Sequence, residues 1–134
     1  MASIRKEILV AVRAEDAWAA VRDVGNIHVR LVPGFVTDSR MEGDTRIVTF
    51  ANGLVVREPI VDIDDDARRV AWAAVDGQFE HYNASLQVFA EGADHARLVW
   101  IADVLPNALA STVEAMIEQG IAVMKQTLER GGPS

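Results

Sequence analysis

The stretch ARLVWIADVLPNALASTVEAMIEQGIAVMKQTLER, residues 96–130, contains the two patterns that decide the fold. Its first part alternates, with Leu98 and Trp100 on the face opposite Arg97, and such alternation is typical of a half-buried strand. After Pro106 the apolar period becomes helical and continues to the end of the stretch. A long amphipathic helix laid against an antiparallel sheet would bury both apolar faces together. The apolar stripe of this helix consists of Leu109, Val113, Met116, Ile117, Gly120, Ile121, Met124 and Leu128.

The residues before this stretch predict further short elements separated by turn signals. Asn52-Gly53 is the strongest hairpin signal in the chain. Glu15-Asp16 places two acids where the first turn of a helix favours them. The expected order is β-α-α-β6-α, an α+β chain. The expected elements are a strand at 3–12, helices at 15–24 and 26–31, strands at 35–41, 45–51, 54–63, 68–75, 79–90 and 96–105, and a final helix to about residue 130.

Length and composition indicate one domain, residues 1–134, large enough to bury a core of its own. The chain has no cysteine, which excludes disulfides, thiolate nucleophiles and cysteine-ligated metal sites. Its formal net charge of −7 disfavours nucleic acid and anionic lipid surfaces as partners. The apolar run at residues 8–12 is too short for a secretion signal or a spanning helix. We therefore expect a cytoplasmic protein without stable membrane insertion.

The hairpin around Asn52-Gly53 predicts which side chains face inward. A two-residue turn would pair Ala51 with Leu54 and so fix the register of both strands. Arg46 then falls on a face that we expect to be exposed. Glu58 falls on the inward face, where a carboxylate is costly unless it is paired, solvated or used. The inward face comprises Ile47, Thr49, Ala51, Leu54, Val56, Glu58 and Ile60.

The later strands divide into faces in the same way, and their inward set mixes large and small side chains. Trp72 and Tyr82 alternate with alanines such as Ala84, and Gly120 removes a side chain from the helix stripe. Such a mixture either interdigitates into a solid core or leaves a cavity, and the sequence leaves both open. The inward set comprises Val70, Trp72, Ala74, Tyr82, Ala84, Leu86, Val88, Leu98, Trp100, Ala102 and Val104.

Nearly the whole chain resembles the START/birch-pollen-allergen-like superfamily, also called SRPBCC. The segment DTRIVTFANGLVVREPIVDIDDDARRVAWAAVDG, which begins at Asp44, is similar to bacterial polyketide cyclase/dehydrase-like members, as are EHYNASLQVF and ARLVWIAD further on. The resemblance implies a helix-grip fold, in which a curved seven-stranded antiparallel sheet wraps around a long C-terminal helix. The pattern is also similar to that of the plant abscisic-acid receptors. Their Ser-Gly-Leu-Pro gate loop is replaced here by Ala51-Asn52-Gly53-Leu54, so we expect no closing lid of that type.

The resemblance to the receptors also implies a set of pocket residues. Those receptors carry a pocket glutamate at the position of Glu58, a pocket aromatic at Trp72 and a pocket tyrosine at Tyr82. Their apolar strand residues match Ile47 and Thr49. These five side chains are therefore expected to face a ligand cavity between the sheet and the last helix.

Three functions remain open at this point. The first is a binding module for a small hydrophobic or aromatic molecule, with lipids included, whose polar end is oriented by Glu58, Tyr82 and Thr49. The second is an enzyme of the polyketide cyclase, aromatase or dehydratase type, in which Glu58 exchanges protons with the help of Tyr82 or His28. The third is a regulatory protein without a small ligand. The expected ligand-binding residues are Ile47, Thr49, Leu54, Val56, Glu58, Trp72, Tyr82, Ala84, Leu98, Trp100, Met116 and Gly120.

Neither a metal nor a cofactor is expected. The acidic run Asp62–Asp66 lacks the glycine and glutamate of an EF-hand loop and is interpreted as a solvated turn. The chain contains no phosphate-binding loop, dinucleotide fingerprint or nucleophile elbow. Val99 and Ile101 are apolar residues on the expected outer face, and they allow a homodimer without requiring one.

Overall fold

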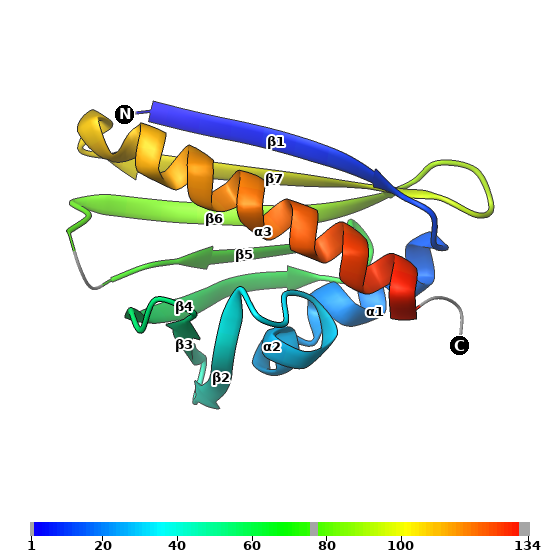
Figure 1. Ribbon diagram of the computed structural model, residues 1–134, viewed down its shortest axis with the longest axis horizontal. Helices are drawn as coiled ribbons and strands as arrows, with labels where there is room; N and C mark the ends of the chain where they lie inside the picture. The colour runs from blue at the N-terminus through cyan, green and yellow to red at the C-terminus, as the bar shows by residue number, and fades with distance from the viewer. Residues whose placement is uncertain (1, 76–77, 132–134) are drawn as a thin grey trace.

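The computed structural model describes residues 2–75 and 78–131 of the chain. Seven strands and a long C-terminal helix follow the order expected from the sequence (Figure 1). The elements are β1 (Ala2–Val10), α1 (Ala14–Arg22), the 3₁₀ turn η1 (Val24–Asn26), α2 (Ile27–Arg30), β2 (Val36–Glu42), β3 (Thr45–Phe50), β4 (Val55–Asp64), β5 (Arg69–Ala73), β6 (His81–Ala90), β7 (Ala96–Leu105), the 3₁₀ turn η2 (Asn107–Leu109) and α3 (Ala110–Gly131).

The strands form one curved antiparallel sheet in the order β1-β7-β6-β5-β4-β3-β2. In Figure 1, α3 runs along one face of this sheet beside β1 and β7. The short helices α1 and α2 lie near the C-terminal end of α3. The expected helix-grip architecture is therefore confirmed. Among the described residues, no helix has the length and apolarity needed to cross a membrane.

The turn between β3 and β4 differs from the expected one by a residue. Phe50, rather than Ala51, pairs with Leu54: the Phe50 amide donates to the Leu54 carbonyl oxygen at 2.8 Å. The loop thus contains three residues, with Gly53 in the left-handed region at φ 88°. The Asn52 side-chain oxygen accepts a hydrogen bond from the Leu54 amide at 3.0 Å, which stabilises this longer loop. The predicted Ala51–Leu54 pairing is therefore wrong.

This shift reverses the two faces of β3, because side chains alternate along a strand. Arg46 now lies opposite Glu58, and Val48 lies opposite Val56. Arg46 and Val48 point inward and are buried, which corrects the expectation of an exposed Arg46. Thr49 belongs to the outer face, as does Ile47, although Ile47 is buried there.

The other strands have the faces that the alternation predicted. Tyr82 and Leu86 on β6 and Trp100 on β7 are buried on the inner face. The helix residues Val113, Ile117, Ile121, Met124 and Leu128 are buried on the side of α3 that faces the sheet, as the apolar stripe predicted. Most of the core thus lies between α3 and the concave face of the sheet, and the buried charged residues Arg46 and Glu58 interrupt it.

Candidate functional site

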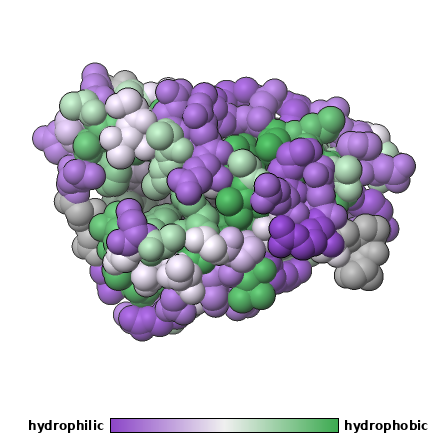
Figure 2. All heavy atoms as spheres, in the orientation of Figure 1, coloured by the Kyte–Doolittle hydropathy of each residue, from purple (hydrophilic) through white to green (hydrophobic). Residues whose placement is uncertain are grey.

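Two adjacent hollows lie between α3 and the sheet. We call the first, of about 60 Å³, the inner cavity, and the second, of about 490 Å³, the outer pocket. The outer pocket opens between the first turns of α3 and the β3–β4 turn, where Figure 2 shows a hollow with apolar walls. Five of the side chains that line the first hollow also line the second, so the two hollows are parts of one site. The shared residues are Phe35, Phe50, Glu58, Tyr82 and Met116.

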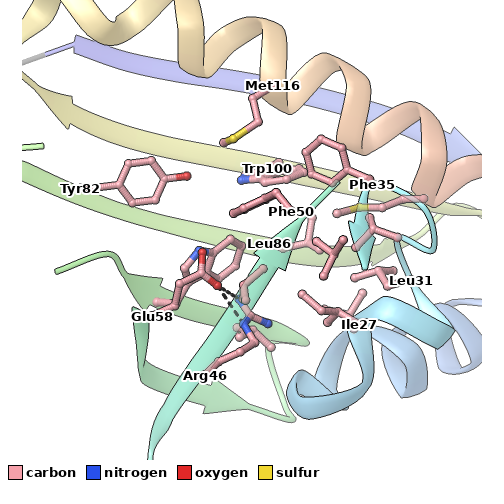
Figure 3. A pocket seen from close by; sticks show the side chains of 17 residues that line it. Ile27, Leu31, Phe35, Arg46, Phe50, Glu58, Tyr82, Leu86, Trp100 and Met116 are labelled. Carbon is pink, nitrogen blue, oxygen red and sulfur yellow. Dashed lines mark hydrogen bonds and ion pairs between the residues drawn. The ribbon is translucent and has the colours of Figure 1, made fainter. Parts of the chain in front are cut away.

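The remaining walls are mostly apolar. With the shared residues included, the inner cavity is lined from α1, α2, the loop before β2, all strands except β1, and α3 (Figure 3). Its other lining residues are Val21, Ile27, Leu31, Val32, Val36, Arg46, Val48, Val70, Trp72, Leu86, Trp100 and Met124. The outer pocket adds Ala51, Asn52, Leu54, Val56, Ala74, Gln78, Phe79, Thr112, Val113, Ala115 and Gln119.

A buried ion pair projects into this apolar space. Arg46 donates from Nε to Oε1 of Glu58 at 2.9 Å, and Arg46 Nη2 lies 2.7 Å from the same oxygen. The two side chains are only 6% and 10% exposed. Arg46 also donates to the carbonyl oxygen of Val24 at 3.3 Å, and its guanidinium carbon lies 5.3 Å from the Trp72 ring centroid. The guanidinium is therefore fixed from three sides.

Glu58 retains one oxygen for a ligand. Both Arg46 contacts go to Oε1, and Oε2 takes part in no hydrogen bond among the described residues. Burial raises the pKa of Glu58 above its ordinary value, and the charge and hydrogen bond of Arg46 oppose that rise. Burial and the neighbouring Glu58 also raise the pKa of Tyr82, which keeps its hydroxyl protonated. The site thus offers one carboxylate oxygen and one phenolic O–H beside apolar walls.

A close approach explains the glycine in the middle of α3. A Cβ at Gly120 would lie 3.0 Å from Trp100 Cζ3 and 3.2 Å from Phe35 Cε2. The helix can therefore come down onto both aromatic rings only because no side chain is present there. The Trp100 ring in turn lies 6.2 Å from the Trp72 ring, centroid to centroid.

The structure brings together part of the set expected from the sequence. Seven residues line the two hollows: Leu54, Val56, Glu58, Trp72, Tyr82, Trp100 and Met116. Ala84 and Leu98 are buried in the core and line neither hollow, and Gly120 contacts the Trp100 ring without facing either space. Ile47 and Thr49 lie on the opposite face of β3, and His28 lies on α2 outside both sets of walls. Within residues 2–75 and 78–131, no group of acidic or histidine side chains could hold a metal.

Several wall residues were not expected from the sequence, and Arg46 is the most important of them. The alternation of Arg46, Val48 and Phe50 could have identified an inward face if the longer turn had been considered. Phe35 could not have been found in this way, because it precedes β2 in a loop. Its position depends on the packing of that loop beneath α3.

Comparison with protein families identifies the chain. The model for polyketide cyclase/dehydrase and lipid transport matches residues 1–129. The chain belongs to this family. No curated protein sequence matches it.

Solved structures agree with this assignment at the level of the fold. A protein from Thermobifida fusca, solved in solution by NMR, is 27% identical with a TM-score of 0.79, over 96% of this chain and 91% of that one. The di-domain ARO/CYC protein BexL from the BE-7585A biosynthetic pathway is 21% identical with a TM-score of 0.80, over 96% of this chain and 47% of that one. Norcoclaurine synthase from Thalictrum flavum, solved with dopamine and hydroxybenzaldehyde, is 18% identical with a TM-score of 0.72, over 96% of this chain and 84% of that one.

Proposed function

We propose that the protein binds a small, largely apolar organic molecule across the inner cavity and the outer pocket, with a polar group of that molecule at Glu58. The observation that carries this proposal is the buried Arg46–Glu58 pair, which interrupts an otherwise apolar wall. Ionised side chains are rarely taken out of water. A protein in which hydrophobic residues of similar volume replace a buried ion pair is often at least as stable. An ion pair with one free oxygen facing a hollow is better explained by recognition than by stability.

The size and lining of the hollows support the same function. Protein interiors are close-packed and contain few voids larger than a water molecule. The outer pocket, about 490 Å³, falls within the range of sites that hold drug-sized ligands, roughly 300–1,000 Å³. The family description names polyketide cyclases and lipid transport, and both concern molecules with large apolar surfaces.

Calorimetry with bicyclic aromatic compounds tests this proposal. The affinities of the wild type are compared with those of variants at two neighbouring alanines. Ala74 lines the outer pocket, whereas Ala73, the last residue of β5, faces the other side. We expect Ala74→Phe to fill part of the pocket and weaken binding at least fivefold, and Ala73→Phe to leave the affinity unchanged. Equal effects of the two substitutions, or no binding of any compound by the wild type, would contradict the proposal.

A second candidate is acid–base catalysis of the cyclase or dehydratase type. Glu58 favours it, because its raised pKa makes the carboxylate a stronger base than an exposed one, and Tyr82 lines the same two hollows. The simplest reaction to test is the exchange of α-protons of 1-tetralone in D₂O, followed by NMR. An enzyme should accelerate this exchange as pH rises through the pKa of Glu58, and Glu58→Gln should abolish the acceleration. A protein that only binds should leave the exchange rate unchanged.

A further inference from the structure

Three buried side-chain polar atoms have no hydrogen-bond partner among the described residues: His28 Nδ1, Ser39 Oγ and Trp100 Nε1. Only Trp100 belongs to the walls of the hollows. The indole nitrogen of Trp100 is buried and has no hydrogen-bond partner among the described residues, and the residue as a whole is 6% exposed. By contrast, Trp18 donates its indole N–H to Asp65 at 3.0 Å. An indole N–H can only donate, and leaving it unpaired in the interior costs free energy. A ligand that supplies an acceptor would remove this cost.

The unused donor faces the ligand site. Trp100 lines the inner cavity, and in Figure 3 its nitrogen is directed toward the side of the cavity where the Tyr82 hydroxyl lies. The two residues are on neighbouring strands: Trp100 pairs with Leu86 and Tyr82 pairs with Val104. They are thus four positions apart along the strands, roughly 13 Å between backbones. In Figure 3 the Tyr82 hydroxyl and the Trp100 nitrogen point toward each other across the hollow.

The Tyr82 hydroxyl is available as a second donor. It makes no hydrogen bond among the residues that the structure describes, although it borders both hollows. Burial and the nearby Glu58 raise its pKa, so the hydroxyl keeps its proton. One O–H donor and one N–H donor on the wall of an apolar hollow are together complementary to an oxygen with two lone pairs.

We propose that Trp100 and Tyr82 select ligands that carry a carbonyl oxygen, which accepts hydrogen bonds from the Trp100 indole N–H and the Tyr82 hydroxyl inside the inner cavity. Trp100 is then the residue that distinguishes a ketone from the corresponding hydrocarbon. This inference rests on the proposed binding function and narrows its ligand class to molecules that carry a carbonyl group in addition to the polar group at Glu58, whose free carboxylate oxygen accepts hydrogen bonds and so cannot pair with a carbonyl oxygen. The apolar body of such a ligand extends into the outer pocket, which is several times larger than the inner cavity.

A matched pair of ligands tests the inference. 1-Tetralone and tetralin share a bicyclic skeleton, and only the former has a carbonyl group. Calorimetry gives the ratio of their dissociation constants for the wild type and for Trp100→Phe, which keeps an aromatic ring and removes the N–H. We expect the preference for the ketone to fall about tenfold in Trp100→Phe, the value of one buried hydrogen bond. Trp18→Phe is the control, because its indole lies outside the site, and it should leave the ratio unchanged.

NMR of the wild type provides a second readout that does not depend on a variant folding. The indole N–H signal of Trp100 should move downfield on addition of 1-tetralone and stay in place with tetralin. A ratio unchanged by Trp100→Phe, or equal shifts with both compounds, would overturn the inference while leaving the binding function intact. If neither compound binds, the proposed function itself fails for this ligand class, and the inference fails with it.

Discussion

Substitution of Arg46 by methionine should reveal how strongly the buried ion pair depends on both partners. The two side chains are 6% and 10% exposed, so solvent screens them little. Removal of one partner from such a pair costs about 3–5 kcal/mol, because the remaining charge stays buried without compensation. We therefore expect Arg46→Met to lower the free energy of unfolding by about 3–5 kcal/mol at pH 8.

The loss should shrink at low pH, and the sign follows from the pKa of Glu58. Burial already raises this pKa above its ordinary value of 4.5, and removal of the Arg46 charge raises it further. The folded protein then holds a proton at pH values where the unfolded chain has released it. The free energy of unfolding therefore falls as pH rises from about 4.5 through the folded-state pKa, by up to about 1.4 kcal/mol per pH unit. Arg46→Met should accordingly be more stable at pH 5 than at pH 8.

Urea denaturation followed by tryptophan fluorescence, at pH 5 and pH 8, measures both effects. The double variant Arg46→Met/Glu58→Gln carries no charge at this buried site and should be more stable at pH 8 than Arg46→Met alone. Arg40→Met is the control, because Arg40 forms an exposed pair with Glu42 at 3.1 Å and should change stability by less than about 1 kcal/mol. A loss below 1 kcal/mol in Arg46→Met, or one that is the same at both pH values, would refute the reasoning.

Three further substitutions separate the residues of the site from those of the core. Gly120→Ala places a methyl group 3.0 Å from the Trp100 ring, so it should destabilise the protein by up to about 2 kcal/mol in a urea titration despite the better helix propensity of alanine. Gly131→Ala should have no such effect, because its methyl group would contact no described residue outside its own helix. Leu98→Ala should cost about 2–5 kcal/mol in the same assay and leave ligand affinity unchanged by calorimetry, because Leu98 is fully buried away from the hollows. Thr49→Val, on the outer face of β3, should leave the affinity for 1-tetralone unchanged, and a fivefold loss would return Thr49 to the site.

Local pattern predicted the elements, and it failed at the one place where two local structures compete. Asn52-Gly53 fits a two-residue turn, and it also fits a three-residue loop in which Gly53 is left-handed. The two turns differ by one residue in register, and a shift of one residue exchanges the faces of a strand. In the register that the longer loop sets, Val48 and Phe50 face the cavity, and Arg46 reaches Glu58. These distant contacts stabilise the longer loop together with the hydrogen bond from the Leu54 amide to Asn52, and the dipeptide by itself does not distinguish the two turns.

The sequence alone determined the antiparallel sheet, the helix that lies on it and the inward direction of Trp72, Tyr82 and Trp100. These features follow from the spacing of apolar residues, every two residues in a strand and every 3.6 in a helix, which is visible in a single chain. Only the tertiary structure decided that Arg46 joins Glu58, because this pairing depends on the register between two strands. It also decided that space remains beneath α3, since the volume left between large and small side chains depends on how closely the helix approaches the sheet.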